Sequence, residues 1–216
     1  AGVAQGFRQR GVDIWEDFGT IESFSRTKSG MRMHYAGAGE RQSIEAELVI
    51  SAVGWAADVS GLRLGCAGVD LTPRGFIEVD DHLRTSNPAI YAAGDVTGRT
   101  MLGSEAIRDG VIAADNAVAG PRSTVADHYA AEGSFTDPEY ASVGLTEAAA
   151  RRSGTDVHCT TLDYARCTRP IIDGQTYGFC KLVLDGSTAE VLGCHVVGDR
   201  AIDIVQVMSV ALSSGL

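Results

Sequence analysis

The sequence predicts an α/β fold in two parts, a front part built around a parallel sheet and a separate α+β unit behind it. In the front part, residues 90–93 form an apolar run with the composition of a buried strand, which ends in Gly94 and Asp95. An amphipathic helix follows a few residues later. From His128 onward the composition changes to short strands, turns and a last apolar helix, which is typical of an α+β unit.

The bulk composition is that of an ordinary globular chain. Its 216 residues are 44% hydrophobic and 21% charged, which fits one or two domains. The formal net charge is −10 and the Lys and Arg residues form no basic stripe, so we expect no nucleic-acid partner. The sequence has neither an apolar run of about 18 residues nor a leader pattern, so we expect a cytoplasmic protein without a membrane partner.

The cysteines and histidines show no metal or redox motif. No two of the five cysteines are closer than eight positions, which excludes C-x-x-C and argues against a disulfide framework. We therefore expect small buried thiols and no metal site. Packed or solvated roles are expected for all five histidines, His34, His82, His128, His158 and His195. Tyr164 is expected to pack.

The front part is predicted to begin with the end of a helix that stops at Gly11, followed by a strand over residues 12–15. A meander comes next: a strand, a Lys-Ser-Gly turn, a return strand over residues 31–35, a Gly-rich turn and a buried strand over residues 48–52. A further short strand is expected over residues 75–80.

Residues 103–120 predict a helix. Its apolar side chains fall in one stripe, which Gly120-Pro121 ends: Ile107, Val111, Ala114 and Val118.

The back part is predicted to hold a helix capped by Thr146, an extended segment over residues 156–165, and a hairpin that turns at residues 185–187. The last helix has a broad apolar face made of Ala201, Ile204, Val205, Met208, Ala211 and Leu212.

The end of the apolar strand predicts a ligand site. Gly94 leaves room for a ligand to approach the backbone, and Asp95 offers acceptor oxygens that suit hydroxyl groups better than phosphate. Free N–H groups near Leu102, Gly103 and Ser104 present the positive end of a helix. A flavin nucleotide fits both features, because its ribityl chain has hydroxyls and its reduced ring gains negative charge. A plain turn in which Asp95 bonds its own backbone remains the alternative.

Several segments resemble the pyridine nucleotide-disulfide oxidoreductases of class I. LRTSNPAIYAAGDVTG, followed by ML, resembles their second flavin-contact motif, and LVISAVGWAAD resembles the strand that closes their NAD(P) domain. FTDPEYASVGLTEAAA and YGFCKLVLDGSTAEVLGCHVVGDRAID resemble their dimerisation domain. The resemblance covers nearly the whole chain in the same order.

The resemblance implies the ends of two Rossmann-like domains followed by an α+β dimerisation domain. Residues 1–55 would be the C-terminal part of the NAD(P)-binding domain and residues 56–122 that of the FAD-binding domain. Residues 123–216 would be the dimerisation domain, truncated at its C-terminus.

The resemblance also implies cofactor contacts. Gly54 would lie against the nicotinamide nucleotide, and Asp95 would bond the ribityl chain of FAD. Backbone atoms of Met101, Leu102, Gly103 and Ser104 would line the flavin ring. The segment WAAD after Gly54 departs from the family pattern, which puts the dinucleotide contacts there in question.

The expected function is that of an FAD-dependent NAD(P)H:disulfide oxidoreductase, similar to dihydrolipoamide dehydrogenase, which acts as a homodimer on a small-molecule disulfide. The chain has no G-x-G-x-x-G and no C-x4-C, so we expect a fragment that is inactive alone, and we assign no catalytic residue. Three alternatives remain open: a non-catalytic dimerisation module, a metal ion reductase similar to mercuric reductase, and a flavin reductase without a dithiol.

Overall fold

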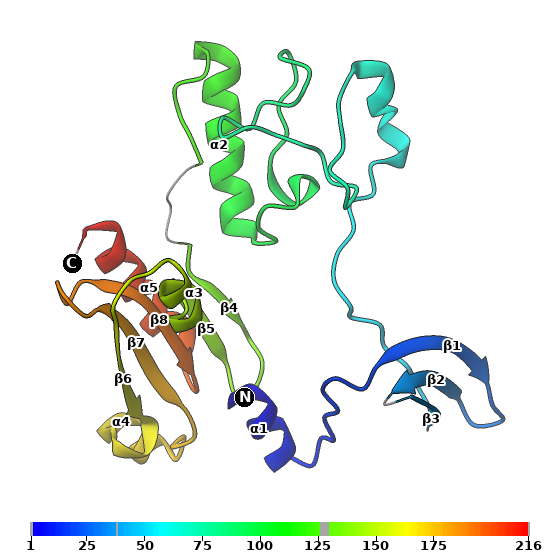
Figure 1. Cartoon of the computed structure of the whole chain (residues 1–216), viewed down its shortest axis with the longest axis vertical. Coiled ribbons are helices and arrows are strands. Elements are labelled where there is room, and N and C mark those ends of the chain that lie inside the picture. Colours follow the sequence, from blue (N-terminus) through cyan, green and yellow to red (C-terminus); the bar gives the residue numbers. More distant parts are fainter. Residues whose placement is uncertain (1, 38, 126–129, 216) are drawn as a thin grey trace. The chain divides into compact units, whose positions relative to one another are not determined.

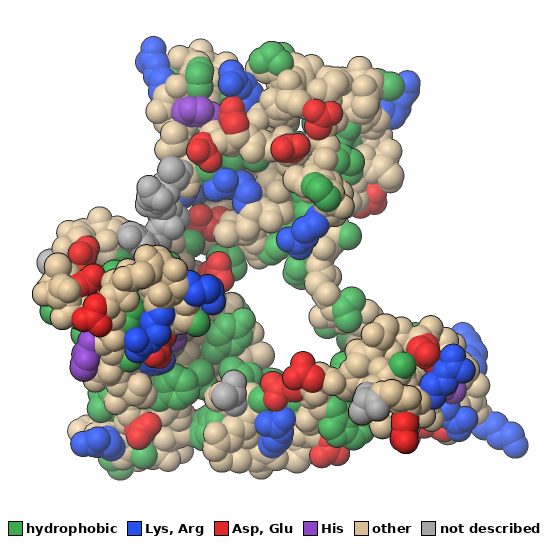
Figure 2. Space-filling model, viewed as in Figure 1, with side chains coloured by type: hydrophobic (Ala, Val, Ile, Leu, Met, Phe, Trp, Pro, Cys, Tyr) green, Lys and Arg blue, Asp and Glu red, His purple; other side chains and the backbone are tan. Residues whose placement is uncertain are grey.

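The computed structural model describes residues 2–37, 39–125 and 130–215 (Figure 1). The chain divides into two compact units, Phe7–Trp55 and Ala1–Gly6 together with Ala56–Leu216. Lys, Arg, Asp and Glu side chains are interspersed over the face shown in Figure 2. Among the described residues, no helix is long and apolar enough to cross a membrane.

The Phe7–Trp55 unit is built on a three-stranded antiparallel sheet in the order β1-β2-β3 (Figure 1). The strands are β1 (Thr20–Arg26), β2 (Met31–Gly37) and β3 (Glu40–Ala46), and none of their residues is buried. The first helix, α1 (Gly2–Gln9), stops just before Gly11, whose φ of +80° suits a glycine. The predicted stop at Gly11 and the first two strands of the meander are therefore confirmed.

The predictions of two strands in this unit are wrong. Residues 48–52 pair with no strand of the described chain, and Leu48 and Ile50 are 73% and 80% exposed. Their place in the meander is taken by β3, whose polar sequence gave a weaker signal than the apolar run after it. Residues 12–15 are likewise irregular, because an apolar run becomes a strand only where a neighbour takes up its backbone groups.

Residues 56–125 contain one long helix and little other regular structure. The helix is α2 (Gly103–Ala119), and three short 3₁₀ turns precede it: η1 (Ser60–Leu62), η2 (Leu64–Ala67) and η3 (Gly94–Thr97). The strands predicted over residues 75–80 and 90–93 shrink to two isolated bridges, Leu71 with Ile77 and Arg84 with Tyr91. Each bridge is held by a single pair of backbone bonds, such as Thr85 N to Ile90 O and Ala92 N to Leu83 O, while Ile77 N donates outside its bridge to Val96 O.

Helix α2 forms where the sequence predicts it and ends at Gly120, whose φ is +81°. The predicted apolar stripe, however, lies on the open face: Ile107, Val111 and Val118 are 73%, 58% and 91% exposed. The opposite face is buried and carries Glu105, Asp109, Ile112, Ala113 and Asn116. The segments that pack against the helix decide which face is covered, and here Leu83 and Val125 contact Ile112 and Ala113.

Residues 130–215 form a five-stranded antiparallel sheet in the order β4-β5-β8-β7-β6 (Figure 1). The strands are β4 (Glu132–Ser134), β5 (Tyr140–Gly144), β6 (Val157–Asp163), β7 (Phe179–Asp185) and β8 (Val191–Val197). The short helical elements are α3 (Glu147–Arg152), η4 (Tyr164–Arg166) and α4 (Thr168–Asp173). The predicted hairpin is confirmed, and its turn is held by Asp185 Oδ1, which accepts from the amides of Ser187 and Thr188.

The core of this region lies between the sheet and α5 (Ala201–Ser213). Ala201, Val205 and Leu212 of the predicted apolar face are buried there against β5 and β8. The predicted cap of α3 is also confirmed, because Thr146 Oγ1 accepts from Ala149 N at 3.2 Å.

Candidate functional site

Gly94 opens the turn η3 directly after the extended residue Ala93. Its φ is +74°, and a Cβ there would lie 3.1 Å from the Cβ of Ala106 in the first turn of α2. Thr97 Oγ1 closes the turn by donating to Gly94 O at 2.7 Å. The absence of a side chain at Gly94 therefore lets η3 pack against the start of α2. This packing role is additional to the ligand approach that the sequence predicted.

Asp95 stands exposed on this turn. Among the described residues its carboxylate has no hydrogen bond or ion pair, and only its carbonyl is engaged, accepting from Gly98 N at 3.1 Å. The alternative in which the side chain bonds its own backbone is therefore not seen. The carboxylate is available to accept hydrogen bonds from outside the chain.

The start of α2 lies beside this carboxylate-bearing turn, since α2 and η3 are in contact. Leu102 takes an extended conformation as the residue before the helix, and its side chain caps no amide. Gly103 and Ser104 are exposed, while Met101 and Leu102 are half-buried. The first amides of α2 thus carry the positive end of the helix toward an open surface.

Glu105 lies in the first turn of α2, but its side chain does not face the open surface. Its residue is only 8% exposed on the buried face of the helix, and Arg108 Nη1 lies 3.8 Å from its Oε2. Gly94, Asp95, Met101, Leu102, Gly103 and Ser104 are therefore brought together around one helix end. Gly54 belongs to the Phe7–Trp55 unit, where it is exposed with a φ of +120° and open space beside it.

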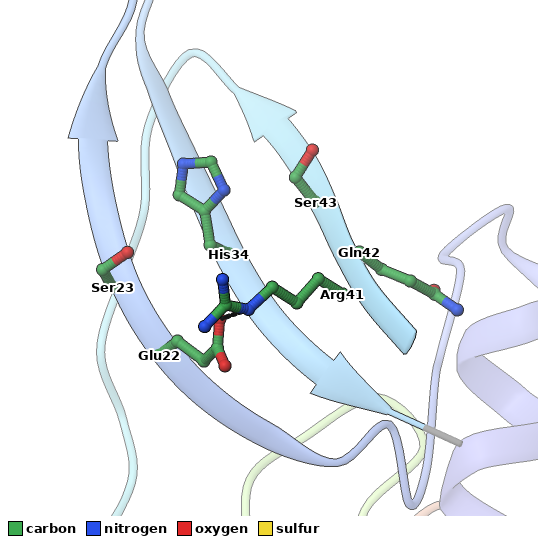
Figure 3. Close-up of a pocket in the computed structure, with 6 residues that line it drawn as sticks. All are labelled: Glu22, Ser23, His34, Arg41, Gln42 and Ser43. Atoms are coloured by element: carbon green, nitrogen blue, oxygen red, sulfur yellow. Dashed lines mark ion pairs between the residues drawn. The ribbon is translucent and has the colours of Figure 1, made fainter. Parts of the chain in front are cut away.

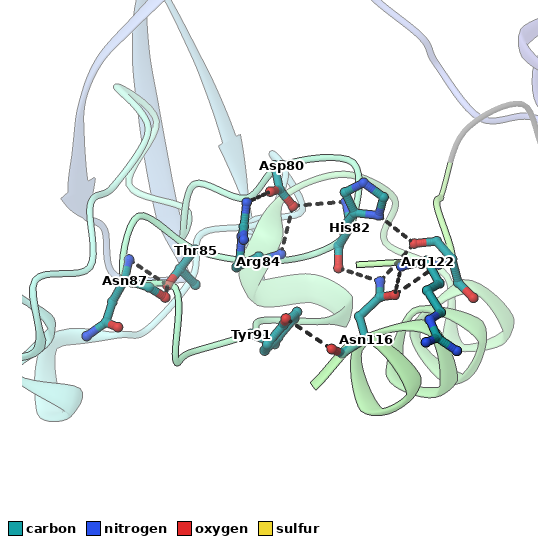
Figure 4. A network of polar contacts seen from close by, with 9 residues as sticks. Asp80, His82, Arg84, Thr85, Asn87, Tyr91, Asn116 and Arg122 are labelled. Atoms are coloured by element: carbon teal, nitrogen blue, oxygen red, sulfur yellow. Dashed lines mark hydrogen bonds and ion pairs between the residues drawn. The ribbon is translucent and has the colours of Figure 1, made fainter. Parts of the chain in front are cut away.

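A polar network fixes the loops of residues 80–123 to α2 (Figure 4). Asn116 is 1% exposed, and its Nδ2 donates to His82 O and Ser123 O at 3.0 and 2.8 Å. Its Oδ1 accepts from the amides of Arg122 and Ser123, both at 2.9 Å. Sequence reasoning missed Asn116, because nothing in a helical pattern marks an asparagine that bonds both the loop after the helix and His82, 34 positions earlier.

Asp80 closes the other end of this network. Its Oδ1 accepts from the amides of His82 and Arg84, and Oδ2 lies 3.3 Å from the Arg84 guanidinium. Burial alone would raise the pKa of this carboxyl, but the two amides and the guanidinium together hold it below its usual value.

Tyr164 and the histidines, for which the sequence predicts packed or solvated roles, lie away from the start of α2 in the sequence. Tyr164 is 4% exposed and donates to Asp199 O at 3.0 Å, and burial raises its pKa to about 12, so its packing role is confirmed. His195 contacts Leu145 O at 3.1 Å and His82 contacts Ser123 O at 2.8 Å. His158 is exposed, and His128 lies outside the described residues. No group of three or more potential metal ligands occurs in the described part of the chain.

His34 borders a polar hollow on the three-stranded sheet, with a volume of about 580 Å³ (Figure 3). Arg41 of β3 reaches across β2 to Glu22 of β1, with Nε and Oε2 3.2 Å apart. Ser25 Oγ lies 3.0 Å from His34 Nε2. Because these charges are already paired and lie at the surface, the hollow is a solvated face of the sheet.

Two family models match the chain. Residues 3–110 match the model described as pyridine nucleotide-disulphide oxidoreductase, and residues 130–216 match the dimerisation domain of the same family. The chain belongs to the pyridine nucleotide-disulphide oxidoreductase family. Members of this family contain FAD and use NAD(P)H. The expected fold class, the ends of NAD(P)- and FAD-binding Rossmann-like domains followed by an α+β dimerisation domain, is confirmed.

Curated relatives from this family include two kinds of enzyme. A mercuric reductase from Bacillus cereus is 33% identical over 214 residues, which cover 99% of this chain and 34% of the relative. A dihydrolipoyl dehydrogenase from Mycobacterium tuberculosis is 35% identical over 210 residues, covering 97% and 45%. The chain therefore spans about a third to a half of the length of these relatives.

Solved structures agree with this assignment. The HOCl-induced flavoprotein disulfide reductase RclA from Escherichia coli matches with a TM-score of 0.86 and 26% identity, covering 99% of this chain and 48% of its own. LpdA from Mycobacterium tuberculosis matches with a TM-score of 0.85 and 27% identity, covering 98% and 45%.

Proposed function

We propose that this chain holds the ribityl chain and ring edge of FAD in an NAD(P)H:disulfide oxidoreductase similar to dihydrolipoyl dehydrogenase. The observation that supports this most is the exposed, unpartnered carboxylate of Asp95 beside the uncapped start of α2. A buried or self-bonded aspartate would have fewer acceptor positions left for a ligand. The family match supplies the cofactor that fits these groups.

Each group of residues would contact a different part of the cofactor. Asp95 accepts hydrogen bonds from the ribityl hydroxyls, which its negative charge strengthens. The amides of Leu102, Gly103 and Ser104, with the backbone of Met101, line the edge of the ring and stabilise negative charge that develops there. When bound, FAD passes electrons from NAD(P)H to the acceptor.

The domain limits proposed from the sequence complete this assignment. Residues 1–55 would contact the nicotinamide nucleotide through Gly54, residues 56–122 would contact FAD, and residues 123–216 would form a homodimer. The acceptor would be a small disulfide, with a metal ion as the second candidate because a mercuric reductase is nearly as similar as a dihydrolipoyl dehydrogenase. We propose that the 216 residues do not turn over alone, because they contain no C-x4-C pair.

Flavin titration tests the assignment of Asp95. We expect riboflavin and FAD fluorescence to be quenched in a saturable way by the purified chain, and Asp95→Ala to weaken binding about tenfold or more, since a hydrogen bond to a charged group contributes about 1.5–3 kcal/mol. Asp81→Ala, which removes an exposed carboxylate from the same region, should bind as the parent does. Equal affinity of the Asp95 variant would refute the site, and steady NADPH-dependent disulfide reduction would refute the proposed inactivity.

A further inference from the structure

Two thiols face each other inside the back sheet. Cys180 of β7 is half-buried, Cys194 of β8 is 0% exposed, and their sulfur atoms are 3.9 Å apart. Strand register pairs Cys180 with Val196 and Cys194 with Leu182, so the two cysteines are diagonal neighbours across the β7–β8 ladder. Both belong to the core cluster packed under α5.

A cavity of about 500 Å³ opens on Cys180 and not on Cys194. Its apolar wall includes Leu162, Tyr164, Pro170, Ile204 and Val207. The charged side chains at the cavity include Arg169, paired with Asp173, and Arg200, which lies near Asp199. Asp203 lines the cavity as well, so two arginines and three aspartates surround a mostly apolar wall, which favours a small uncharged molecule over an anion.

We propose that Cys180 is a site of reversible modification by small uncharged disulfides that enter this cavity, with Cys194 as the hydrogen-bond donor that stabilises the Cys180 thiolate. The site goes beyond the proposed flavin function and does not depend on it. Its evidence is the cavity, the sulfur–sulfur contact and the register of the two strands.

The reaction is a thiol–disulfide exchange without net oxidation or reduction of the combined sulfur pool. The Cys180 thiolate attacks one sulfur of the small disulfide, the bond between its two sulfurs breaks, and a Cys180–S–S–R bond forms. The leaving thiolate takes a proton from water. The contact with the Cys194 thiol lowers the pKa of Cys180 below its ordinary value, which favours the thiolate at the cavity.

Strand register works against resolution of the adduct by Cys194. Diagonal neighbours in an antiparallel sheet have Cα atoms about 7–8 Å apart, whereas a disulfide needs about 4.4–6.8 Å. The pKa of Cys194 is also raised, by the contact with Cys180 and by burial, which keeps it protonated. The mixed disulfide should therefore persist until an external thiol removes it.

The chain offers internal comparisons among its other thiols. Burial and the neighbouring Glu147 raise the pKa of Cys159, which makes it a slower nucleophile. Cys66 is exposed, so it reports simple accessibility. Cys167 lines the same cavity but contacts Asp163 O at 3.5 Å instead of a second thiol. Its labelling therefore reports whether a position at the cavity is sufficient for modification.

The test is exposure of the full chain to 2-hydroxyethyl disulfide at pH 7, followed by intact-mass and peptide mass spectrometry. We expect one adduct, on Cys180, which dithiothreitol removes. Cys180→Ser should abolish it, and Cys167→Ser should leave it unchanged. First labelling at Cys66 or Cys167, or formation of a Cys180–Cys194 disulfide, would overturn the proposal.

A pH profile tests the part played by Cys194. Cys194→Ala removes the donor, so the pKa of Cys180 should rise toward its ordinary value and the modification rate at pH 7 should fall, because the loss of thiolate outweighs the gain in nucleophilicity. Cys194→Ser keeps a hydrogen-bond donor of similar size, so the pH midpoint of the modification rate should stay as low as in the parent chain. An unchanged profile in the alanine variant, with its circular dichroism spectrum intact, would refute the positioning role.

Discussion

Residues 56–125 and 130–215 are stabilised in different ways. The second region satisfies its backbone through five paired strands and buries one face of α5. The first has one long helix and two isolated bridges, so side chains such as Asp80, Asn87 and Asn116 bond the backbone of its loops instead. The candidate flavin site lies in this first region, where the shape of the loops depends on a few polar side chains.

The largest loss of stability is expected where one polar side chain makes the most hydrogen bonds to the backbone. Asn116→Ala leaves two carbonyls and two amides without the partner described above, and an unsatisfied buried group costs about 1–3 kcal/mol. We expect residues 56–125 to lose at least about 3 kcal/mol of opening free energy. Hydrogen exchange resolved by peptide measures this, because it reports each region separately.

Asn87→Ala is the matched control for that variant. Asn87 is half-buried, and among the described residues its side chain bonds Ala67 O and the Ala89 amide and no others, so about 1 kcal/mol should be lost. Exchange in residues 130–215 should not change in either variant. Equal effects of the two asparagines, or opening of the back sheet, would contradict the division into two modes of stabilisation.

A smaller loss is expected from the core of residues 130–215. Val205 is 0% exposed, and Val205→Ala removes two buried carbons and leaves a cavity, which should cost about 2–3 kcal/mol. Val207 lies two positions along the same helix and is 69% exposed, so Val207→Ala should change stability by less than about 0.5 kcal/mol. The same exchange experiment should now show opening only in residues 130–215.

The contrast between the regions also explains what the sequence could predict. In residues 130–215 the hairpin, the Thr146 cap and α5 follow from local turn chemistry and periodicity, and all three are observed. In residues 56–125 the apolar runs at 75–80 and 90–93 looked like strands but are loops with single bridges. Their conformation depends on partners distant in the chain, which periodicity does not contain.

The two sites differ in the same way. Gly94, Asp95 and the start of α2 were predicted as a site because their signal is local, whereas the packing of Gly94 on Ala106 is seen only in the folded chain. The thiol pair was missed because Cys180 and Cys194 are 14 positions apart. Reflecting the hairpin about Gly186, the middle of the predicted turn, would however have placed Cys194 opposite Gly178, two positions from Cys180.

The smallest effect is expected from a surface polar contact in the region held by its sheet. Glu147 contacts Lys181 Nζ at 2.5 Å and Arg151 Nη2 at 2.9 Å, and the bond from Lys181, followed by that from Arg151, lowers its pKa from 4.5 to about 2. A lowered carboxyl pKa stabilises the folded state above pH 4.5, and this contribution disappears as the pH falls from 4.5 to about 2. Glu147→Gln should therefore lower the melting temperature slightly at pH 7 and leave it unchanged near pH 2.

The reason for a small effect is exposure, because solvent screens an ion pair at the surface. Glu190→Gln removes an exposed carboxylate with no ion-pair partner among the described residues and should show no pH-dependent difference from the parent. Melting curves between pH 2 and pH 7 compare the two variants. If Glu147→Gln destabilised as much as Asn116→Ala, polar side chains would hold the back sheet as firmly as the front loops, and the contrast between the regions would fail.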